Sequence, residues 1–400
     1  MRERGLIPNP FDEMDWSGRG QHAEFDADEE SAVPLIYEET LAKTSTAKVE
    51  SVRCRRIRLA RKTVKVNRRL KKEEVIKEVE HLQRLKHPHI IRVVGTYTLP
   101  RELSILLYPV AEYTLEEFLE STQEDLPPDE ISLRLFSIST FFRCLAKAVA
   151  YIHEKAMKHM DIKPKNLLVR DMKNSTICNQ GQYKIYIADF GITRAYQSIE
   201  DCNTESFTSY TRKYAAPEVV AQERRDQKAD IFSLGAVFAE MLAVLSEPSR
   251  GISNLDYLDK ILRKNAQDPL PSYQANAERV RSWLRFLPIT SYGFESDVSH
   301  APITELAAMM LSPLPADRPT ASTVVNNIPF LAFCCDVNGG AEPFEVADRT
   351  NNRQLYDRAS EITEADGLKY FRCMVDGCVK LYWSREKLEY HAQVSGVSPI

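Results

Sequence analysis

Three side chains with complementary chemistry stand close together in the sequence: Asp161, Lys163 and Asn166. Asp161 can accept a proton, Lys163 can neutralise a phosphate group, and Asn166 can present an oxygen to a hard metal ion. Pro164 restricts the backbone between them, and an apolar run, 167–169, follows. Taken alone, the stretch also fits a solvated loop that leads into a strand. Whether the stretch is catalytic or only a loop depends on whether the other residues of a phosphoryl-transfer site occur elsewhere in the chain.

The composition is ordinary for a soluble globular protein, with 400 residues of which 43% are hydrophobic and 28% charged, and a net charge of −4. This length can build two or more packed lobes or domains. Eight cysteines are scattered without a dense framework, which favours a reducing compartment. Neither an apolar signal core nor a stretch of eighteen apolar residues occurs, so we expect no membrane span and an intracellular location, cytoplasmic, nuclear or both.

Shifts in composition suggest four segments. Residues 1–34 carry many carboxylates and few large apolar residues, which predicts a disordered acidic segment. Residues 35–332 have the patterning of the main folded domain. Residues 333–368 are a polar linker, and residues 369–400 form a compact terminal segment.

Strand-forming runs fill residues 35–107, interrupted by one helical stretch at 71–85, whereas residues 217–329 are chiefly helical. Strands first and helices second predict an α+β protein whose sheet-rich and helical parts are separate lobes. The other predicted helices are 115–119, 136–155, 230–243, 255–265 and 303–311, and strands are predicted on both sides of a turn at 99–101 and within 167–191.

A basic cluster lies between Arg53 and Lys72, where eleven basic residues occur without an acidic one. Such clusters can bind nucleic acid or act as nuclear import signals. Because the basic residues alternate with strand formers, they also fit the solvated face of a small sheet, and this is the interpretation we favour. We therefore do not expect nucleic acid as a partner.

More charged groups stand where the local pattern would position them precisely enough for chemistry. Asp189 ends the alternating apolar run 183–188, so it lies at the end of a strand, and Gly191 permits an unusual backbone turn. Lys62 ends another strand pattern. Glu78 lies on the helical stretch that follows, able to face inward.

The order and intervals of these motifs resemble the eukaryotic protein kinase family. The resemblance implies a bilobal protein kinase fold, with a β-rich N-lobe and a helical C-lobe. It also implies structural roles for Asp230 beneath the catalytic loop and for Glu218 paired with Arg318. The matching motifs are the strand lysine Lys62, its helix partner Glu78, the catalytic loop 159–166, the metal-binding turn 189–191 and the end of the activation segment, 216–218.

What the resemblance implies for catalysis is transfer of the γ-phosphate of ATP to a hydroxyl group of a protein substrate. Asp161 would orient that hydroxyl and take its proton, and Lys163 would sit near the transferred phosphate. Lys62 would hold the α- and β-phosphates, itself oriented by Glu78. Lys163 together with Thr211 resembles the serine/threonine-specific members of the family.

The resemblance also implies a nucleotide site with Mg²⁺, or Mn²⁺ in its place, held by Asn166 and Asp189. The hinge, where backbone groups would meet adenine, corresponds to residues 108–111. The residues implied to bind the nucleotide and its metal are Ala42, Val49, Ala60, Lys62, Tyr108, Val110, Ala111, Asn166 and Asp189.

Two departures from the family pattern bear on activity. Ala42, Thr44 and Ala47 stand where three glycines are usual, which predicts weaker ATP binding or slower turnover. The alternative function is therefore a weakly active or inactive pseudokinase that serves as a nucleotide-binding scaffold. Met160 replaces the arginine usual in the catalytic loop, so we expect activity not to depend on an activation-segment phosphate at that contact.

The terminal segment resembles a Cys2His2 zinc finger of ββα form, with Cys373, Cys378 and His391 at the positions of three ligands. Ser395–Val397 occupy the places where a second histidine could stand. Two interpretations stay open, a three-ligand Zn²⁺ site and a degenerate finger that folds without tight zinc. Protein docking is the simpler role for a single incomplete finger.

Overall fold

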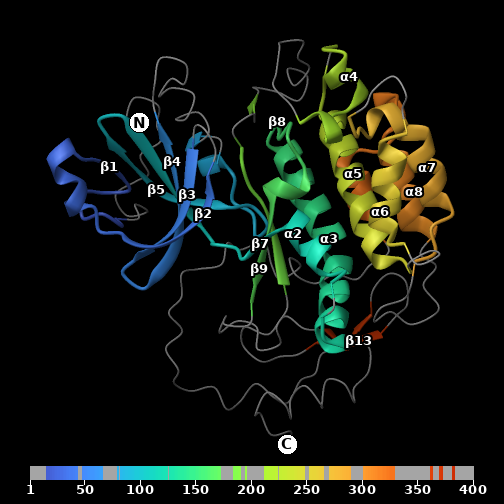
Figure 1. Cartoon of the computed structure of the whole chain (residues 1–400), viewed down its shortest axis with the longest axis horizontal. Helices are drawn as coiled ribbons and strands as arrows, with labels where there is room; N and C mark the ends of the chain where they lie inside the picture. Colours follow the sequence, from blue (N-terminus) through green and yellow to red (C-terminus); the bar gives the residue numbers. More distant parts are fainter. Residues whose placement is uncertain are drawn as a thin grey trace, which may run out of the picture.

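The computed structural model describes most of the chain up to residue 328. The described residues are 15–43, 47–65, 79–80, 82–124, 126–172, 183–190, 211–223, 225–247, 252–264, 270–289 and 303–328, together with the backbone of 194–195, 301–302, 361–363, 369–372 and 381–382. Figure 1 shows a strand-rich lobe beside a helical lobe. The prediction of an α+β protein with a β-rich N-lobe and a helical C-lobe is confirmed.

The N-lobe contains a six-stranded sheet in the order β1-β5-β6-β4-β3-β2. Its five later strands pair antiparallel, whereas β1 runs parallel to β5. The two strands predicted around the turn at 99–101 are confirmed as β5 and β6. The strands span His22–Glu24 (β1), Ile36–Lys43 (β2), Ala47–Cys54 (β3), Ile57–Lys65 (β4), Arg92–Leu99 (β5) and Glu102–Tyr108 (β6).

One face of this sheet packs against the predicted helix, of which residues 79–80 and 82–84 are described as helical. Val79 and Leu82 are buried and belong to the same apolar cluster as Leu103 and Ile105 of β6. Each such side chain, once buried, contributes about 1.5–3 kcal/mol. The helical spacing seen in the sequence therefore places the apolar face of this helix against the sheet.

The predicted disorder of residues 1–34 is wrong for residues 15–34. Trp16 and Phe25 are 6% and 5% exposed, and both pack against Tyr97, with ring centroids 5.8 and 6.0 Å away. These two aromatic side chains supply enough apolar surface for the segment to pack on the lobe, although its overall composition is acidic. After β1 comes a 3₁₀ helix, η2 (Ala27–Ala32). Residues 1–14 lie outside the described residues.

The acidic character of this segment is balanced locally. The Arg19 guanidinium lies 2.7 Å from Glu29 Oε1, and its hydrogen bonds lower the pKa of Glu29 to about 2. Arg19 also lies over the ring of Phe25, 4.6 Å from its centroid. Pairing of this kind lets a carboxylate-rich segment lie against the lobe.

The C-lobe is built around the buried helices α3 and α5. Helix α3 is long and apolar enough to cross a membrane by length and composition alone, but 67% of its most apolar window is buried in the lobe, as expected of a core helix. It begins at Pro128, earlier than the predicted Phe136, because proline at the first turn suits a helix start. The helices span Leu115–Ser121 (α2), Pro128–Glu154 (α3), Pro217–Val220 (α4), Lys228–Leu245 (α5), Asn254–Leu262 (α6), Ala277–Arg285 (α7), Ala301–Met310 (α8) and Ala321–Asn326 (α9).

Short strands and turns connect the lobes and carry the polar motifs. A three-stranded sheet has the order β10-β9-β7, and β8 pairs with β11. A further sheet, β12-β13-β14, lies near the C-terminal end of the chain, and β12 falls within the predicted linker. These elements span Tyr113–Thr114 (β7), Met157–Lys158 (β8), Pro164–Asn166 (η3), Leu167–Asp171 (β9), Tyr183–Ile187 (β10), Arg194–Ala195 (β11), Arg212–Tyr214 (η5), Gln274–Asn276 (η6), Pro315–Asp317 (η7), Glu361–Thr363 (β12), Lys369–Arg372 (β13) and Leu381–Tyr382 (β14).

Candidate active site

The three side chains singled out first in the sequence form one hydrogen-bonded group. The Lys163 ammonium lies 2.6 Å from Asp161 Oδ2, and Asn166 Nδ2 donates to the same oxygen at 2.9 Å. Thr211, far along the chain, joins them: its hydroxyl donates to Asp161 Oδ1 at 2.8 Å and accepts from Lys163 at 2.6 Å. The side chains of Asp161 and Lys163 are only 10% and 18% exposed, so the Asp161 carboxylate is held in one orientation.

Asp230, at the start of α5, supports this loop from below. Its carboxylate accepts backbone N–H groups of His159 at 2.9 Å and Met160 at 2.8 Å. Met160 has a positive φ of 69°, an unfavourable conformation for a side chain other than glycine, so these bonds hold a strained turn. Although burial alone would raise the pKa of Asp230, the hydrogen bond and charge of His153 hold it below its usual range.

His153 is a contributor that the sequence analysis missed. Its Nε2 lies 3.0 Å from Asp230 Oδ2, and the residue sits in the last turn of α3. The available signal was weak: a single histidine after the apolar run 148–152. The contact spans 77 residues, and only the packing of α3 against α5 brings the two side chains together.

Strand β10 delivers Asp189 to the catalytic loop. Ala188 N–H donates to the backbone carbonyl of Asn166 at 2.9 Å, so the next residue, Asp189, lies beside Asn166. His159 Nε2 lies 3.1 Å from Ala188 O, and its ring meets the edge of Phe190 at 4.8 Å between centroids. His159 and Phe190 therefore pack together and join the loop to the turn.

Lys62 of β4 reaches across from the N-lobe to this turn. Its Nζ lies 3.0 Å from Asp189 Oδ1, with the Lys62 side chain 17% exposed. Burial would raise the pKa of Asp189, but the charge and hydrogen bond of Lys62 hold it below its usual range. Asp189 has a positive φ of 61°, which turns its carboxylate out of the strand direction. Glu78, the predicted partner of Lys62, lies outside the described residues.

The residues predicted to meet the nucleotide occupy neighbouring strands. Val49 on β3 is the register partner of Lys62, and Ala42 on β2 is the partner of Val49. Ala60 pairs with Leu107 just before the hinge. The remaining predicted contacts are Tyr108 at the end of β6 and the two residues after Pro109, Val110 and Ala111, while Thr44 of the missing glycine-rich loop lies outside the described residues.

The oxygen atoms near Asp189 suit Mg²⁺. A carboxylate from Asp189 and the amide Oδ1 of Asn166 are hard ligands, and Asn166 uses its other amide atom, Nδ2, towards Asp161. Among the described residues no group of three or more His, Cys, Asp or Glu side chains could hold a metal. Two protein ligands nevertheless suffice for Mg²⁺ that also binds phosphate oxygens and water. Cys373, Cys378 and His391 lie outside the described residues.

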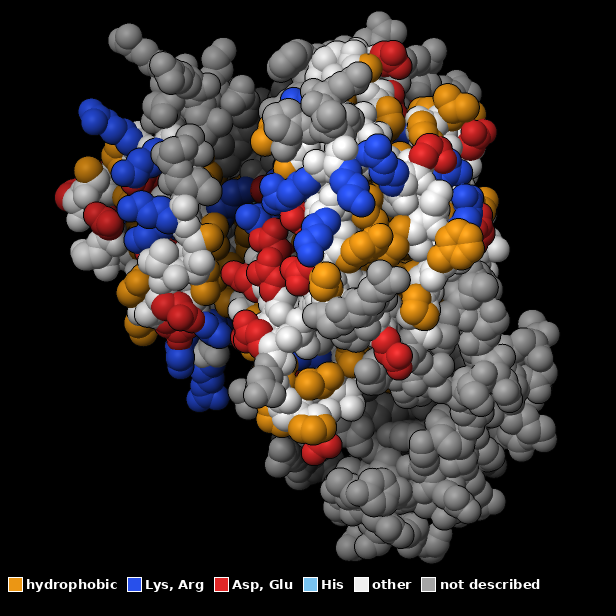
Figure 2. Space-filling model, turned by 45° about the vertical axis from the view of Figure 1, so that its right-hand side comes forward, with side chains coloured by type: hydrophobic (Ala, Val, Ile, Leu, Met, Phe, Trp, Pro, Cys, Tyr) orange, Lys and Arg blue, Asp and Glu red, His pale blue; other side chains and the backbone are white. Residues whose placement is uncertain are grey.

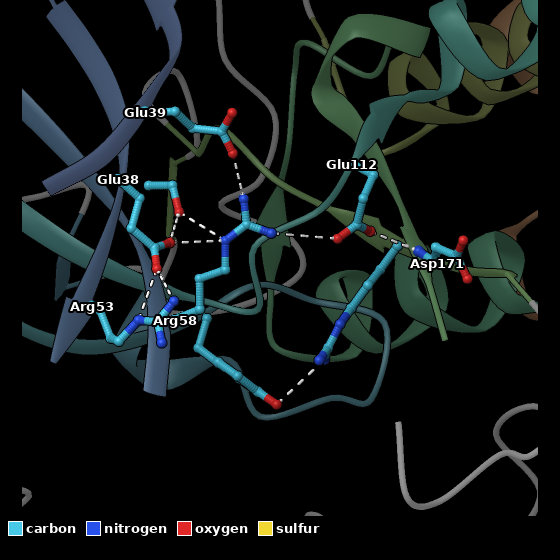
Figure 3. Close-up of polar contacts among 9 residues, drawn as sticks. Glu38, Glu39, Arg53, Arg58, Glu112 and Asp171 are labelled. Atoms are coloured by element: carbon cyan, nitrogen blue, oxygen red, sulfur yellow. Dashed lines mark hydrogen bonds and ion pairs between the residues drawn. The ribbon is translucent and has the colours of Figure 1, made fainter. Parts of the chain in front are cut away.

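An ionic network lies behind the hinge (Figure 3). Arg58 on β4 lies between Glu38 and Glu39 of β2 on one side and Glu112, after the hinge, on the other, with its Nε 3.1 Å from Glu38 and its Nη1 3.7 Å from Glu112. Glu112 in turn accepts the backbone N–H of Asp171 on β9 at 2.7 Å. These contacts link the N-lobe sheet to the C-lobe side of the hinge.

Several side chains of the basic cluster 53–72 form ion pairs with carboxylates. Arg53 and Arg58 pair with Glu38, and Arg61 pairs with Glu50 at 2.8 Å. On the face shown in Figure 2, acidic and basic side chains are interspersed around the recess between the lobes. Four basic residues of the cluster, Arg68, Arg69, Lys71 and Lys72, lie outside the described residues.

The predicted pair of Glu218 and Arg318 is present and buried. Arg318 Nη1 and Nη2 lie 2.7 and 2.9 Å from the two Glu218 oxygens, a bidentate arrangement. The Arg318 side chain also donates to the backbone carbonyls of Ser312 at 2.7 Å and Lys228 at 3.0 Å. The pair anchors the end of the activation segment to the loop before α9.

Comparison with known proteins shows which proteins this chain is similar to. A family model described as protein kinase domain matches residues 38–330. Similar proteins include cyclin-dependent kinase D-1 of Arabidopsis thaliana, 30% identical over 221 residues that cover 54% of this chain and 48% of that protein. The serine/threonine-protein kinase crk1 of Schizosaccharomyces pombe is 30% identical over 268 residues, 64% of this chain and 72% of that protein. The serine/threonine-protein kinase ULK3 of Homo sapiens is 24% identical over 230 residues, 58% of this chain and 43% of that protein.

The chain thus spans about half the length of several curated relatives that it matches, with 48% of the Arabidopsis protein and 43% of the human protein covered. The matched region of this chain nevertheless contains the whole described hydrogen-bonded group, from Lys62 to Arg318. The chain belongs to the protein kinase family.

Proposed function

We propose that this protein is a serine/threonine kinase that transfers the γ-phosphate of ATP to a hydroxyl group of a protein substrate. The observation that carries the proposal is the group formed by Asp161, Lys163 and Thr211, next to the Lys62–Asp189 pair. The charged side chains of this group come from three motifs, the strand lysine, the catalytic loop and the metal-binding turn. The fold brings Lys62 within 3.0 Å of Asp189 and holds Lys163 2.6 Å from Asp161. A cluster with only a structural role does not require so many side chains of opposite charge in one place.

The roles follow from geometry and charge. Asp161 can accept the proton of the acceptor hydroxyl, because its carboxylate is oriented by Lys163, Thr211 and Asn166. Lys163, held between Asp161 and Thr211, is placed to neutralise charge on the transferred phosphoryl group. Since phosphoryl transfer proceeds through a loose transition state, this positioning and charge neutralisation are the main contributions that a protein can make.

On the nucleotide side, Lys62 supplies the positive charge for the α- and β-phosphates. Asp189 and Asn166 would hold Mg²⁺, which neutralises the phosphate oxygens when it is bound. The lowered pKa of Asp189 supports this role, because the carboxylate stays ionised throughout the neutral range. The preference for serine or threonine is supported by Thr211 beside Lys163 and by the serine/threonine kinase names of the relatives from fission yeast and human.

Phosphate transfer from ATP to a generic protein substrate tests the proposal. We expect Asp161→Asn to lower kcat by about 10²–10⁴-fold while nucleotide binding persists, because the substitution removes the proton acceptor without removing Lys62 or Asp189. Asp259→Asn, on the exposed side of α6, is the matched control and should leave kcat unchanged. Equal phosphate transfer by wild type and Asp161→Asn would favour the alternative, a nucleotide-binding scaffold.

The missing glycines give a second test of the same site. Ala42 and Ala47 lie on β2 and β3, the strands that would flank the phosphates, and their side chains restrict the approach of backbone N–H groups. Replacing Ala42, Thr44 and Ala47 together by glycine should lower KM for ATP or raise kcat. If both values stay unchanged, the alanines do not limit the nucleotide site.

For the tail, we propose a finger-like unit that uses Cys373, Cys378 and His391. Its support is their spacing together with the antiparallel pairing of β13 and β14, in which Phe371 faces Tyr382 in register. Both cysteines fall in the connection between these strands, the place where a finger holds its thiolate ligands. Zinc content of the purified chain, compared with His391→Ala, tests it: one ion per chain that the substitution removes supports a metal site. Zinc-free protein supports a finger that folds without metal.

A further inference from the structure

Residues 15–34, which precede the matched kinase region, are fitted onto the N-lobe in a specific way. Strand β1 adds to the edge of the sheet beside β5, with His22 opposite Thr96 and Glu24 opposite Thr98 (Figure 1). Backbone bonds continue on both sides of β1: Thr96 N–H donates to Gln21 O and Phe25 N–H donates to Thr98 O, each at 3.0 Å. The segment therefore seals a sheet edge that would otherwise be open to other strands.

The segment packs on the N-lobe at Gly95 of β5, where the absence of a side chain leaves room for it. A Cβ at that position would lie 2.3 Å from Trp16 Nε1 and 2.4 Å from Gln21 O, distances at which no side chain fits. The Trp16 indole donates to Gln21 O at 2.9 Å, and the Trp16 carbonyl accepts from Cys54 Sγ at 3.6 Å. Strand β5 thus lacks a side chain at the point where the segment crosses it.

His22 of β1 reaches beyond the sheet to the helix that packs on it. His22 Nε2 lies 2.7 Å from Nε2 of Gln83, and His22 Nδ1 lies 2.8 Å from the Thr96 hydroxyl. A neutral ring that donates from Nδ1 to Thr96 and accepts at Nε2 from Gln83 satisfies both contacts. Gln83 lies on the helix at 82–84, the continuation of the helix predicted to carry Glu78.

We propose that residues 15–34 position this helix in cis, through the His22–Gln83 bridge, and thereby set the geometry of the Lys62 site. The proposal rests on the proposed kinase function, since the affected step is nucleotide use by that site. Among the described residues, Val79 and Leu82 pack this helix against the sheet through apolar contacts, which are not directional. The His22–Gln83 hydrogen bond is directional and comes from a segment that packs at Gly95. It therefore can fix the position of the helix along the sheet.

The experiment compares full-length wild type with His22→Ala, Gln83→Ala and the double variant. Amide hydrogen exchange of the helix reports its order, and steady-state kinetics give kcat and KM for ATP. We expect each single variant to raise exchange at 79–84 and to lower kcat/KM for ATP about three- to tenfold, the range expected for loss of one hydrogen bond. Because both substitutions break the same bridge, the double variant should be no worse than either single one.

Gly95→Ala tests the packing of the segment at this position, because the added Cβ displaces Trp16 and the Gln21 carbonyl while the side chains of His22 and Gln83 are retained. We expect the same kinetic defect together with a shift of tryptophan fluorescence towards longer wavelength. Asp28→Ala, an exposed change in the same segment, is the control and should match wild type. Melting temperatures of all variants separate a kinetic defect from loss of folded protein.

Unchanged exchange and kinetics in His22→Ala and Gln83→Ala would overturn the proposal. So would defects that add in the double variant, or variants that lower only the melting temperature, since the segment would then be a structural cover. An inactive wild type would contradict the proposed kinase function instead. The exchange comparison would still decide in that case whether the segment holds the helix.

Discussion

Thr211 and Asp161 lie 50 residues apart in the sequence and are joined by a 2.8 Å hydrogen bond. The same hydroxyl accepts from Lys163 at 2.6 Å, so one side chain near the end of the activation segment contacts both Asp161 and Lys163. Removal of the hydroxyl leaves Asp161 and Lys163 in direct contact but frees both from their common anchor. The bond is therefore a link between segment position and catalytic geometry.

Replacement of Thr211 tests this link. Thr211→Ala should lower kcat about tenfold or more, because the orientation of Asp161 is lost while its charge persists. Thr211→Ser retains the hydroxyl and should retain most of the activity. Phosphate transfer under saturating ATP is the measurement, and equal activity of the alanine and serine variants would show that the hydroxyl has no catalytic importance.

Lys62→Met should affect both nucleotide use and the acid limb of the pH profile. The substitution removes the charge that lowers the pKa of Asp189, so that pKa rises. Activity should then be lost at a higher pH as the solution is acidified, because Asp189 takes up a proton sooner. The pH dependence of kcat/KM for ATP is the measurement. A profile displaced towards lower pH, or an unchanged one, would contradict the Lys62–Asp189 pairing seen here.

Activity should not depend on a contact between residue 160 and a phosphate of the activation segment, because the Met160 thioether cannot pair with a phosphate. Alanine at all of the nearby hydroxyl positions should leave more than about half of kcat, since no charge-assisted contact to residue 160 is lost. The positions to replace together are Ser198, Thr204, Ser206, Thr208 and Ser209. Complete loss of phosphate transfer in this variant would show that another group reads a phosphate there.

Arg318→Ala should destabilise the C-lobe by ~3–5 kcal/mol, because it leaves the buried Glu218 carboxylate without its bidentate partner. Arg285→Ala breaks an exposed pair with Glu305, whose side chains are 39% and 48% exposed, and should lose at most ~1 kcal/mol. Urea unfolding of both variants gives the comparison. Similar losses in the two would mean that the buried pair adds nothing beyond a surface ion pair.

The half-buried His87 should make the protein less stable as the pH falls. Burial, and then the charges of His89, Lys147 and Lys184, lower the pKa of His87 to about 3. Because this lies below the value of about 6.5 for an unfolded chain, the unfolded state binds the extra proton between the two, and stability falls with falling pH across that window.

The His87 contribution should amount to about 2 kcal/mol between pH values of about 7 and about 5. His87→Gln removes the titrating group, so its unfolding free energy should change less over the same interval. Denaturant unfolding at the two pH values measures the difference. A steeper pH dependence in His87→Gln than in wild type would reverse the expected sign.

The local part of this molecule could be predicted from the sequence. The helical spacing of Val79 and Leu82, the strands on either side of the turn at 99–101 and the order of the polar motifs all follow from short-range periodicity and chemistry. Asp161, Lys163 and Asn166 lie within a short stretch of sequence, 161–166, so their proximity required no tertiary information. The bilobal α+β architecture followed from the order of strands and helices.

The long-range part was decided only by packing. The contact of Lys62 with Asp189 crosses 127 residues, and that of His153 with Asp230 crosses 77, so each depends on sheet register and helix packing. The error at residues 15–34 has the same origin. Composition averages charge over a segment, whereas docking depends on two aromatic side chains meeting a strand that has room for them at Gly95. The sequence by itself thus determined which groups do the chemistry, and the tertiary structure decided which of them meet and that the acidic segment belongs to the kinase lobe.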